Sequence, residues 1–562
     1  MIGSTATAAP EGPRRREADG GWRAVPWAEA IAGVAADLAS LGTPPGAVRA
    51  AGGGAFAVYA GRRARVAASR TAAFGRALGT GRVFAWREAD EAALAVAARQ
   101  VLGHPVTLVP DLDRAHHVLW LGARPPAPRA RTAPGGGPRP SLTVAWPRAG
   151  PAGVHLTLRP GCEVFLVLGM AGAILARGWG DAQCLRDLTR GSEEAACALA
   201  PWPPERCAIR CGLDRDELLA EALRFARAPM AVAAGEPAVF RSPHGGLLAW
   251  SLLLLHAATA NALRPGGLYA PPPAPGARAP GPLGRRLRAW AGGLLPPTPA
   301  APTPSSLFAP PDPPRALLAA GGLPTDDYGP APAHHLDSLD FIVLLDPSPG
   351  EHHPRVRWVL PGPGQPGGRP VEDVLGDLFE RFLGARAGPL PPGLNWRLAI
   401  HEAADLLQDG PRRFRDLVLP VRPAPGAQDD RARWDVAHPD GRLHLGPPPS
   451  LADLADARPD PARPLALYAG EPQVTPGARP RLRLHPSVGA SDGARVTVDT
   501  ASGSFDAVVA LDSTLRRDVA EAAPLPGLAG ALDVPDPVTE EPWRHGAPCR
   551  IFVPHPKRRS RS

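Results

Sequence analysis

Short apolar segments alternate with helical segments along residues 21–269, and this alternation constrains the fold more than any other feature. Apolar side chains recur at helical spacing in 21–42, and a second helical segment at 88–103 ends at Gly103. Apolar runs of strand length lie between and after these helices, such as GAFAVYAG, HHVLWLG and SLTVAW. Strands that alternate with helices form parallel sheets covered by helices. The predicted fold class is therefore α/β, with parallel-sheet domains of the dinucleotide-binding type.

Two long apolar runs are predicted to be buried helices and not membrane spans. The run from Val164 to Ala176 has thirteen residues, whereas a transmembrane helix needs roughly twenty. The second run, near residues 245–263, is interrupted by Ser251, His256 and Asn261. The N-terminus is polar and Arg-rich, which is unlike a signal peptide. The six cysteines show no paired spacing, so we expect a reducing, cytoplasmic compartment and no metal held by Cys207 and Cys211.

The charge pattern argues against a nucleic-acid partner. The formal net charge is +8 over 562 residues, and the aromatic content is 5%. Basic residues gather only in the short clusters GPRRR, GRRAR and PKRRSRS. Nucleic-acid proteins usually combine a clustered basic face with aromatic stacking platforms. We interpret the short clusters as solvated surface and a disordered tail.

Composition divides the chain into several predicted parts. One α/β domain is split between residues 21–90 and 333–425, and a second α/β domain covers 91–269. Between them lies a Pro-rich linker or insert at 270–332. Alternating apolar residues and a Ser-Gly hairpin predict a β-barrel domain at 440–555. The ends are predicted to be a disordered N-terminus at 1–20 and a basic tail at 556–562.

Several loops follow predicted strands and are suited to bind an anion. They contain LGARPP, AWPRAG and LRPGCE. Pro160 fixes the chain direction, Gly161 allows close backbone approach, and Arg159 offers a bidentate contact to a phosphate. In parallel sheets, ligands bind at the carboxyl ends of the strands. The alternative is a plain turn between a strand and a helix.

Three pairs of adjacent histidines were considered as metal ligands: His116-His117, His334-His335 and His352-His353. Neighbouring residues in a strand point to opposite faces, so such a pair seldom chelates one ion. We therefore interpret them as surface or loop histidines.

The order of the segments resembles the molybdopterin oxidoreductase family, of the dimethyl sulfoxide reductase and formate dehydrogenase type. DLDRAHHVLWLGARPP resembles the family's strand that ends in Gly-Ala-Asn-Pro, and HLTLRPGCEVFLVLGMAGAILARGWGD resembles its RPGTD segment with the helix that follows. LLLLHAATANALRPGG is similar to its LTGNLDRPGG segment, and LRLHPSVGASDGARVTVDTASGSFDAVV to its C-terminal barrel domain. The match extends from about Gly20 to Pro554.

This resemblance implies a C-terminal barrel of the double-psi type and a cofactor of two molybdopterin guanine dinucleotides with molybdenum or tungsten. It implies a two-electron oxidation or reduction of a small substrate. No cysteine precedes Cys162, so the family's N-terminal iron–sulfur cluster is expected to be absent, and a partner subunit would carry the electrons. The cofactor-binding positions that the resemblance implies are Gly122, Ala123, Arg124, Pro125, Pro147, Arg148, Arg159, Pro160, Gly161, Glu163, Gly235, Asn261, Arg264, Gly266 and Gly267.

The sequence departs from the family at several of these positions. Arg124 stands at the Asn of Gly-Ala-Asn-Pro, Trp146 at the Asp of the family's DPR, and Glu163 near the Asp of RPGTD. The resemblance implies that the family's residues at these positions read the guanine and ribose edges. Residues 79–94 correspond to the region that supplies a Cys, selenocysteine or Ser to the metal, and they contain neither Cys nor Ser. Two other hypotheses therefore remain open. One is a degenerate, non-catalytic member that serves as a scaffold or assembly subunit of an oxidoreductase complex. The other is a subunit like that of formylmethanofuran dehydrogenase.

Overall fold

The computed structural model divides the chain into two compact units. The first contains residues 1–87 and 273–425, and the second contains residues 88–272 and 426–562. The structure describes residues 12–41, 56–67, 71, 74–75, 80, 82–86, 89–103, 108–123, 140–148, 153–242, 244–264, 266–269, 305–308, 313–328, 333–346, 353–387, 436–454, 461–469, 481–501, 503–522 and 545–552. Each unit is described by itself below.

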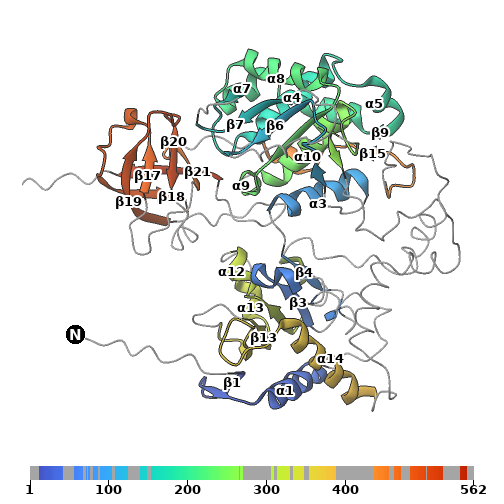
Figure 1. The fold of residues 1–562 in the computed structure, drawn as a ribbon, viewed down its shortest axis with the longest axis vertical. Coiled ribbons are helices and arrows are strands. Elements are labelled where there is room, and N and C mark those ends of the chain that lie inside the picture. The colour runs from blue at the N-terminus through green and yellow to red at the C-terminus, as the bar shows by residue number, and fades with distance from the viewer. Residues whose placement is uncertain are drawn as a thin grey trace, which may run out of the picture. The chain divides into compact units, whose positions relative to one another are not determined.

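A seven-stranded sheet forms the centre of the first unit, in the order β2-β1-β14-β13-β12-β3-β4 (Figure 1). Five of its strands are parallel: β3 (Phe56–Ala60), β4 (Val83–Ala85), β12 (Ala316–Ala320), β13 (Phe341–Leu345) and β14 (Val356–Leu360). The antiparallel strands β1 (Arg14–Arg16) and β2 (Trp22–Ala24) extend the β14 edge. Strands buried on both faces read as continuous apolar runs, which explains segments such as FIVLL in β13.

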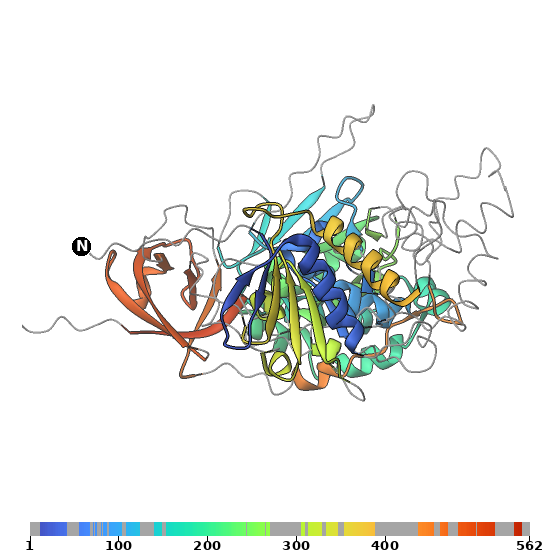
Figure 2. The same ribbon diagram turned by 90° about the horizontal axis from the view of Figure 1, so that it is seen from below.

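Helices cover both faces of this sheet. Val58, Leu318 and Val343 pack in one apolar cluster with α1 (Trp27–Ser40) and α14 (Val371–Ala387). Figure 2 shows α1 and α14 side by side on that face. The alternate strand residues pack on the opposite face, against α12 (Pro324–Tyr328), α13 (Ala333–Asp337) and a short 3-10 helix at Ser305–Phe308. A further 3-10 helix, Arg62–Ala67, follows β3.

Two sequence predictions are wrong in this unit. The span 270–332 was expected to be a linker, but Ala316–Ala320 forms β12 in the interior of the sheet. The segment 1–20 was expected to be disordered, but Arg14–Arg16 forms β1. Apolar neighbours decide both cases. β12 is buried along its whole length, and the guanidinium groups of Arg14 and Arg15 lie over Trp22 and Trp358.

In the second unit, a four-stranded parallel sheet has the order β10-β6-β7-β8. Its strands are β6 (His117–Leu121), β7 (Ser141–Ala145), β8 (Val154–Leu156) and β10 (Ala231–Gly235). Its helices are α3 (Ala89–Leu102), α4 (Glu163–Ala176), α5 (Ala182–Leu188), α6 (Ser192–Leu199), α7 (Pro204–Cys211), α8 (Arg215–Arg227), α9 (Pro237–Phe240), α10 (Gly245–Ala258) and α16 (Ser450–Asp453). Two short strand pairs complete it: β5 (Val109–Pro110) with β11 (Leu268–Tyr269), and β9 (Thr189–Arg190) with β15 (Leu443–His444).

The two long apolar runs form core helices, as predicted. α10 is buried along its entire length and packs against both α3 and α4. Most of α4 is buried in the same apolar cluster. A helix without a polar face needs neighbours on every side. Among the helices in the described part of the chain, none combines the length and apolarity needed to cross a bilayer.

A closed barrel of six strands follows in the second unit, in the order β16-β20-β17-β19-β18-β21 (Figure 1). The strands are β16 (Leu465–Ala469), β17 (Arg481–Leu484), β18 (Arg495–Thr500), β19 (Gly503–Leu511), β20 (Val519–Ala522) and β21 (His545–Phe552). Alternate residues such as Leu482, Leu484, Val496 and Val498 fill its core. Parallel sheets together with this barrel confirm the predicted fold class. β15, however, pairs with β9 beside the α/β sheet and not with a barrel strand.

Candidate functional site

Four loops emerge together at the carboxyl edge of the four-stranded sheet. The last residues of the strands lie level, because Leu121 is in register with both Gly235 and Ala145, and Ala145 with Leu156. This is the edge at which parallel sheets bind ligands. It gathers most of the predicted cofactor positions: Gly122, Ala123, Pro147, Arg148, Arg159, Pro160, Gly161, Glu163 and Gly235. Arg124 and Pro125 lie outside the described residues.

The glycines at this edge allow protein segments to pack closely. Gly122 has a φ of +139°, and a Cβ added to it would lie 2.7 Å from the side chain of Glu236. A Cβ on Gly235 would lie 2.8 Å from Val239 and 3.0 Å from the carbonyl oxygen of Leu121. Both positions therefore need glycine for reasons of local packing.

The barrel reaches this edge through His545, the first residue of β21. Its Nε2 donates a hydrogen bond to Oε1 of Glu163, the first residue of α4, over 2.6 Å. Both side chains are only 1% exposed. The indole of Trp146 stacks on the imidazole, with ring centroids 5.3 Å apart and an interplanar angle of 23°. Glu163 Oε2 is buried and has no hydrogen-bond partner among the described residues.

The next barrel residue closes the turn that follows β8. Gly546 has a φ of +80°, and a Cβ added to it would lie 2.5 Å from the carbonyl oxygen of Pro160 and 2.6 Å from Cα of Gly161. Arg159 donates from Nη2 to the carbonyl oxygen of Pro464, just before β16, over 3.0 Å. The RPG turn that was predicted to approach a phosphate is thus packed against the barrel.

Arg148 is held by acids of the barrel. It forms ion pairs with Glu521 and, over 3.0 Å, with Asp512. Glu521 also accepts hydrogen bonds from the Tyr468 hydroxyl over 2.7 Å and from Arg483 over 3.2 Å. Burial, with Glu521 beside it, raises the pKa of Tyr468 far above its usual value, so this phenol stays protonated. The Arg148 guanidinium therefore already has carboxylate partners.

The remaining predicted positions lie at the opposite, amino edge of the sheet. Asn261 Oδ1 accepts a hydrogen bond from the backbone N–H of Ala231, the first residue of β10, over 3.1 Å. Arg264 donates to the carbonyl oxygen of Pro229. The N–H of Gly266 donates to Asp111 Oδ2 over 2.9 Å, and Gly267 follows in the same turn. The structure thus separates the thirteen implied positions that it describes into two groups at opposite ends of the sheet.

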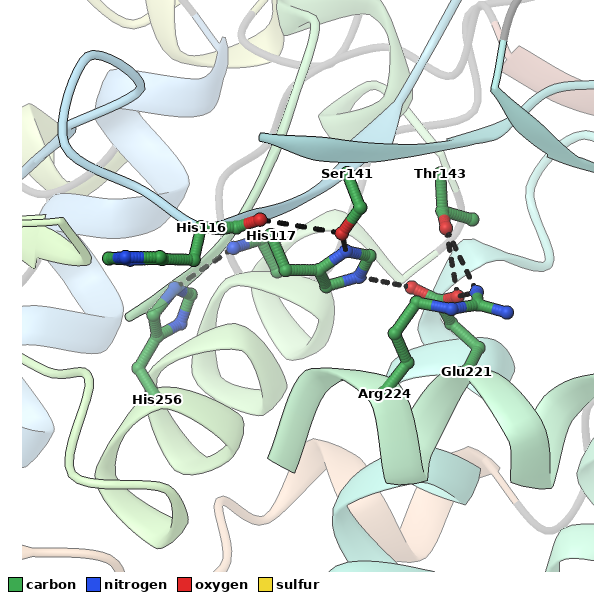
Figure 3. Close-up of polar contacts among 8 residues, drawn as sticks. His116, His117, Ser141, Thr143, Glu221, Arg224 and His256 are labelled. Atoms are coloured by element: carbon green, nitrogen blue, oxygen red, sulfur yellow. Dashed lines mark hydrogen bonds and ion pairs between the residues drawn. The ribbon is translucent and has the colours of Figure 1, made fainter. Parts of the chain in front are cut away.

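A buried histidine that the sequence analysis did not select lies in this sheet. The Nε2 of His256 accepts from the N–H of Ala233 over 3.0 Å (Figure 3). Its Nδ1 donates to the Leu252 carbonyl oxygen over 2.6 Å. Burial lowers its pKa to about 4. His256 is therefore neutral, with its proton on Nδ1, because a second ring proton would face the Ala233 donor.

His117 is not a surface residue, which corrects the interpretation of the His116-His117 pair. It is 1% exposed. Its ring lies between Ser141 and Glu221, with Nδ1 2.8 Å from Ser141 Oγ and Nε2 2.7 Å from Glu221 Oε1 (Figure 3). Thr143 and Arg224 donate to Glu221 Oε2. Buried polar networks of this kind fix the position of a helix on a sheet, here α8 on β6 and β7.

A buried polar cluster lies at the carboxyl edge of the seven-stranded sheet, and the sequence analysis did not select it. Gly321 and Gly322 directly follow β12 and have φ values of +78° and +124°. The Tyr59 hydroxyl donates to Asp327 Oδ2 over 2.7 Å, and the N–H of Arg62 donates to the same oxygen over 2.9 Å. Burial raises the pKa of Asp327. The sequence does contain a pattern that indicates a strand and a turn here, namely the five apolar residues of β12 followed by Gly-Gly. Prolines on both sides led to its interpretation as part of a linker.

The expected metal and nucleotide can be tested against these side chains. In the described part of the chain, no three His, Cys, Asp or Glu side chains are grouped so as to hold a metal ion. Burial raises the pKa of Cys162 and Cys207 to about 12, so both thiols stay protonated at neutral pH. At the carboxyl edge, the carboxylate and the aromatic ring at the implied guanine-reading positions both contact His545. The closed arrangement therefore does not fit a guanine nucleotide at this edge.

Comparison with known proteins bears on the fold. No family model and no curated protein matches the chain. Among solved structures, acetylene hydratase from Pelobacter acetylenicus is similar to it, with a TM-score of 0.64 and 16% sequence identity. The likeness covers 98% of this chain and 93% of the hydratase chain. At this identity it shows the fold alone, and it agrees with the mixed α/β and barrel architecture described above.

Proposed function

We propose that the chain is a non-catalytic protein with the fold of the molybdopterin oxidoreductases, and that it serves as a scaffold or assembly subunit beside a redox-active partner. The hydrogen bond between Glu163 and His545 carries this proposal. It directs a buried imidazole at the carboxylate that the resemblance assigns to guanine, while Trp146 covers the ring. A guanine base would need the same carboxylate and the same space.

Other contacts at this edge support the scaffold. Arg148 is bound to Glu521 and Asp512, and the Pro147 carbonyl oxygen accepts from the N–H of Arg516 over 3.1 Å. Residues at implied ligand positions thus join the α/β sheet to the barrel. Half-buried ion pairs and close backbone packing favour one fixed arrangement, which suits a subunit that positions partners.

A second candidate is a molybdopterin-dependent oxidoreductase, and it is favoured by Oε2 of Glu163, which has no hydrogen-bond partner in the part of the chain that the structure describes. A carboxylate with one free buried oxygen could accept an N–H from a guanine base if His545 moved away. The bound pterin guanine dinucleotides, with molybdenum or tungsten, would then supply two-electron chemistry for a small substrate, and a partner subunit would carry the electrons. The structural neighbour is named as a hydratase, so this fold leaves the reaction class open.

Metal and nucleotide content of the chain separates these candidates. The chain is purified from its native host, and molybdenum, tungsten and released guanine nucleotide are measured per chain. The scaffold predicts none of them in stoichiometric amount. About one metal and about two nucleotides per chain would overturn it and establish a cofactor protein. The isolated complex is then tested for a second chain that carries the redox centre.

A nucleotide-binding assay sharpens the result. Guanosine monophosphate is titrated into the full-length wild type and into the His545→Ala variant. The scaffold predicts no saturable binding to either protein, because the surrounding contacts of the edge remain. Binding that appears only in His545→Ala would favour the second candidate, since it would identify His545 as the group that blocks the base.

A further inference from the structure

We propose that the barrel binds a small organic anion with an apolar body in a cavity on its outer surface. The cavity has a volume of about 580 Å³. Cavities that bind small molecules commonly measure roughly 300–1,000 Å³. It is lined by Pro461, Ala462, Pro464, Leu465, Ser487, Val488, Arg517, Arg550 and Ile551. The cavity adjoins the carboxyl edge of the sheet at Pro464, whose carbonyl oxygen binds Arg159, but none of the implied cofactor positions lines it, so this inference does not depend on the proposed function.

Two arginines make this cavity electropositive. Neither Arg517 nor Arg550 forms an ion pair with a described acid, and no acidic residue lines the cavity. Their nearest acids along the strands are already bound by other arginines. Asp518, next to Arg517, is held by Arg516 over 2.7 Å. The two guanidinium groups therefore keep their charge uncompensated by the described side chains.

The same reasoning applies across the strand pair. Asp499 lies opposite Arg550 in the register of β18 and β21, which is the position of a natural cross-strand partner. However, Asp499 is engaged by Arg463 over 3.2 Å. Arg550 instead lies over the ring of Phe552, 4.8 Å from its centroid. A guanidinium stacked on an aromatic ring keeps its edge free for hydrogen bonds to an anion.

Apart from Ser487, the rest of the wall is apolar, so it favours a ligand that has an apolar body as well as a negative charge. Six lining residues are aliphatic or proline side chains just before or at the start of β16, in the segment after β17 and at the end of β21: Pro461, Ala462, Pro464, Leu465, Val488 and Ile551. Phe552, beside the cavity residue Ile551, is 46% exposed, which is high for an aromatic side chain. A carboxylate or phosphate would contact the arginines, and the apolar body would cover these side chains. Inorganic phosphate, which lacks such a body, is expected to bind more weakly.

The test uses 8-anilinonaphthalene-1-sulfonate, an anion with an apolar body, and follows its fluorescence on titration into the full-length protein. We expect one saturable site. The double variant Arg517→Gln/Arg550→Gln should bind at least about tenfold more weakly, because charge-assisted hydrogen bonds are lost. The matched control Arg227→Gln/Arg442→Gln removes two exposed arginines of the same unit and should bind like the wild type.

A neutral probe of the same shape, N-phenyl-1-naphthylamine, separates charge from apolar contact. It should bind the wild type and the double variant with equal, low affinity. The proposal is overturned if the anion binds both proteins equally, or if the neutral probe binds as tightly as the anion. Circular dichroism of each variant checks that the barrel is folded. The metal and nucleotide content tests the proposed function separately, since neither result alters the other.

Discussion

The two edges of the four-stranded sheet are closed by different parts of the chain. At the carboxyl edge, Glu163 is bound by His545, which lies 382 positions away in the sequence. At the amino edge, Asn261 is bound to Ala231, only 30 positions away. The first closure depends on a second folded domain, and the second depends on neighbouring loops of the same domain.

This difference limits what a turn sequence can indicate. The turns Arg159–Gly161 and Arg264–Gly267 share the letters RPG, and the resemblance gave both to a cofactor. In the structure each turn is bonded to protein, one to the barrel and the other to the loops before β6 and β10. Glycine and proline set the path of the backbone. The direction of the strands decides which edge is available to a ligand.

Removing His545 should give the largest effect, because it exposes the dependence of the carboxyl edge on the barrel. His545→Ala leaves the Glu163 carboxylate buried without a partner. Breaking a buried pair in this way costs about 3–5 kcal/mol. The free energy of unfolding of the second unit, measured by urea titration, should fall by that amount. Hydrogen exchange at Gly546 should accelerate as well, since β21 is held less firmly against the turn at Pro160.

The double variant Glu163→Leu/His545→Leu serves as its control. Replacing both partners with apolar side chains removes the unpaired charge, so most of the stability should return. A loss below about 1 kcal/mol in His545→Ala would mean that the pair does not hold the barrel to the sheet.

The second prediction concerns how the free energy of unfolding depends on pH through the buried side chain of His256. The pKa of His256 is lowered to about 4 by burial, against 6.5 for an exposed histidine. The unfolded chain therefore takes up the proton first as the pH falls. The contribution of neutral His256 to the free energy of unfolding is complete above pH 6.5. It declines as the pH falls from 6.5 to about 4, by on the order of 3 kcal/mol.

Urea unfolding of the wild type and of His256→Gln at several pH values between 7 and 4 measures this effect. The glutamine amide cannot titrate, yet it can accept from Ala233 and donate to Leu252. The difference in unfolding free energy between the two proteins should change in favour of the variant as the pH falls. A constant difference over this range would show that His256 does not titrate on unfolding.

Much of the fold could be predicted from periodicity, and both missed strands lie where the local composition is unlike that of a strand. Apolar runs of strand length gave β6, β7 and β13, and alternation gave the barrel. β12 was missed because its five residues, ALLAA, lie among prolines, so the composition of the window outweighed a short apolar run. β1 was missed because three arginines indicate solvent, whereas Trp22 and Trp358 cover their guanidinium groups.

The candidate site was harder to predict because its closure is not local. The loops at Gly122, Arg148 and Arg159 were correctly placed after strands, since a strand and its following turn are contiguous in sequence. Nothing in those loops indicates that His545 and Glu521 bind there. Pairings over such sequence separations come from docking of the barrel, which no short pattern encodes. The same holds for His117, whose partner Glu221 belongs to a helix 104 positions later.

The third prediction tests whether the amino edge is structural. Asn261 is 1% exposed, and its side chain satisfies the N–H of Ala231 and donates to Thr259 Oγ1 over 3.0 Å. Asn261→Ala leaves a buried N–H without an acceptor, which costs about 1–3 kcal/mol in unfolding free energy. Thr259→Val keeps the bond to Ala231 and should cost less. If Asn261→Ala left stability unchanged but altered the binding of a nucleotide, the amino edge would be a ligand site.

The smallest effect is expected at Arg159, where the two accounts of the carboxyl edge differ most clearly. Among the described residues its guanidinium makes one hydrogen bond, to the Pro464 carbonyl oxygen. Arg159→Gln should therefore lower the unfolding free energy by only about 0.5–1.5 kcal/mol, the net value of one such bond. Arg159→Lys keeps the positive charge and serves as the control.

Guanosine monophosphate should bind none of the three proteins, wild type, Arg159→Gln and Arg159→Lys, measurably. If Arg159 held a phosphate, the wild type would bind the nucleotide, Arg159→Lys would retain part of that affinity, and Arg159→Gln would lose it with little change in stability. That pattern would make the RPG turn a ligand contact and reduce the packing of Gly546 on Pro160 to a secondary role.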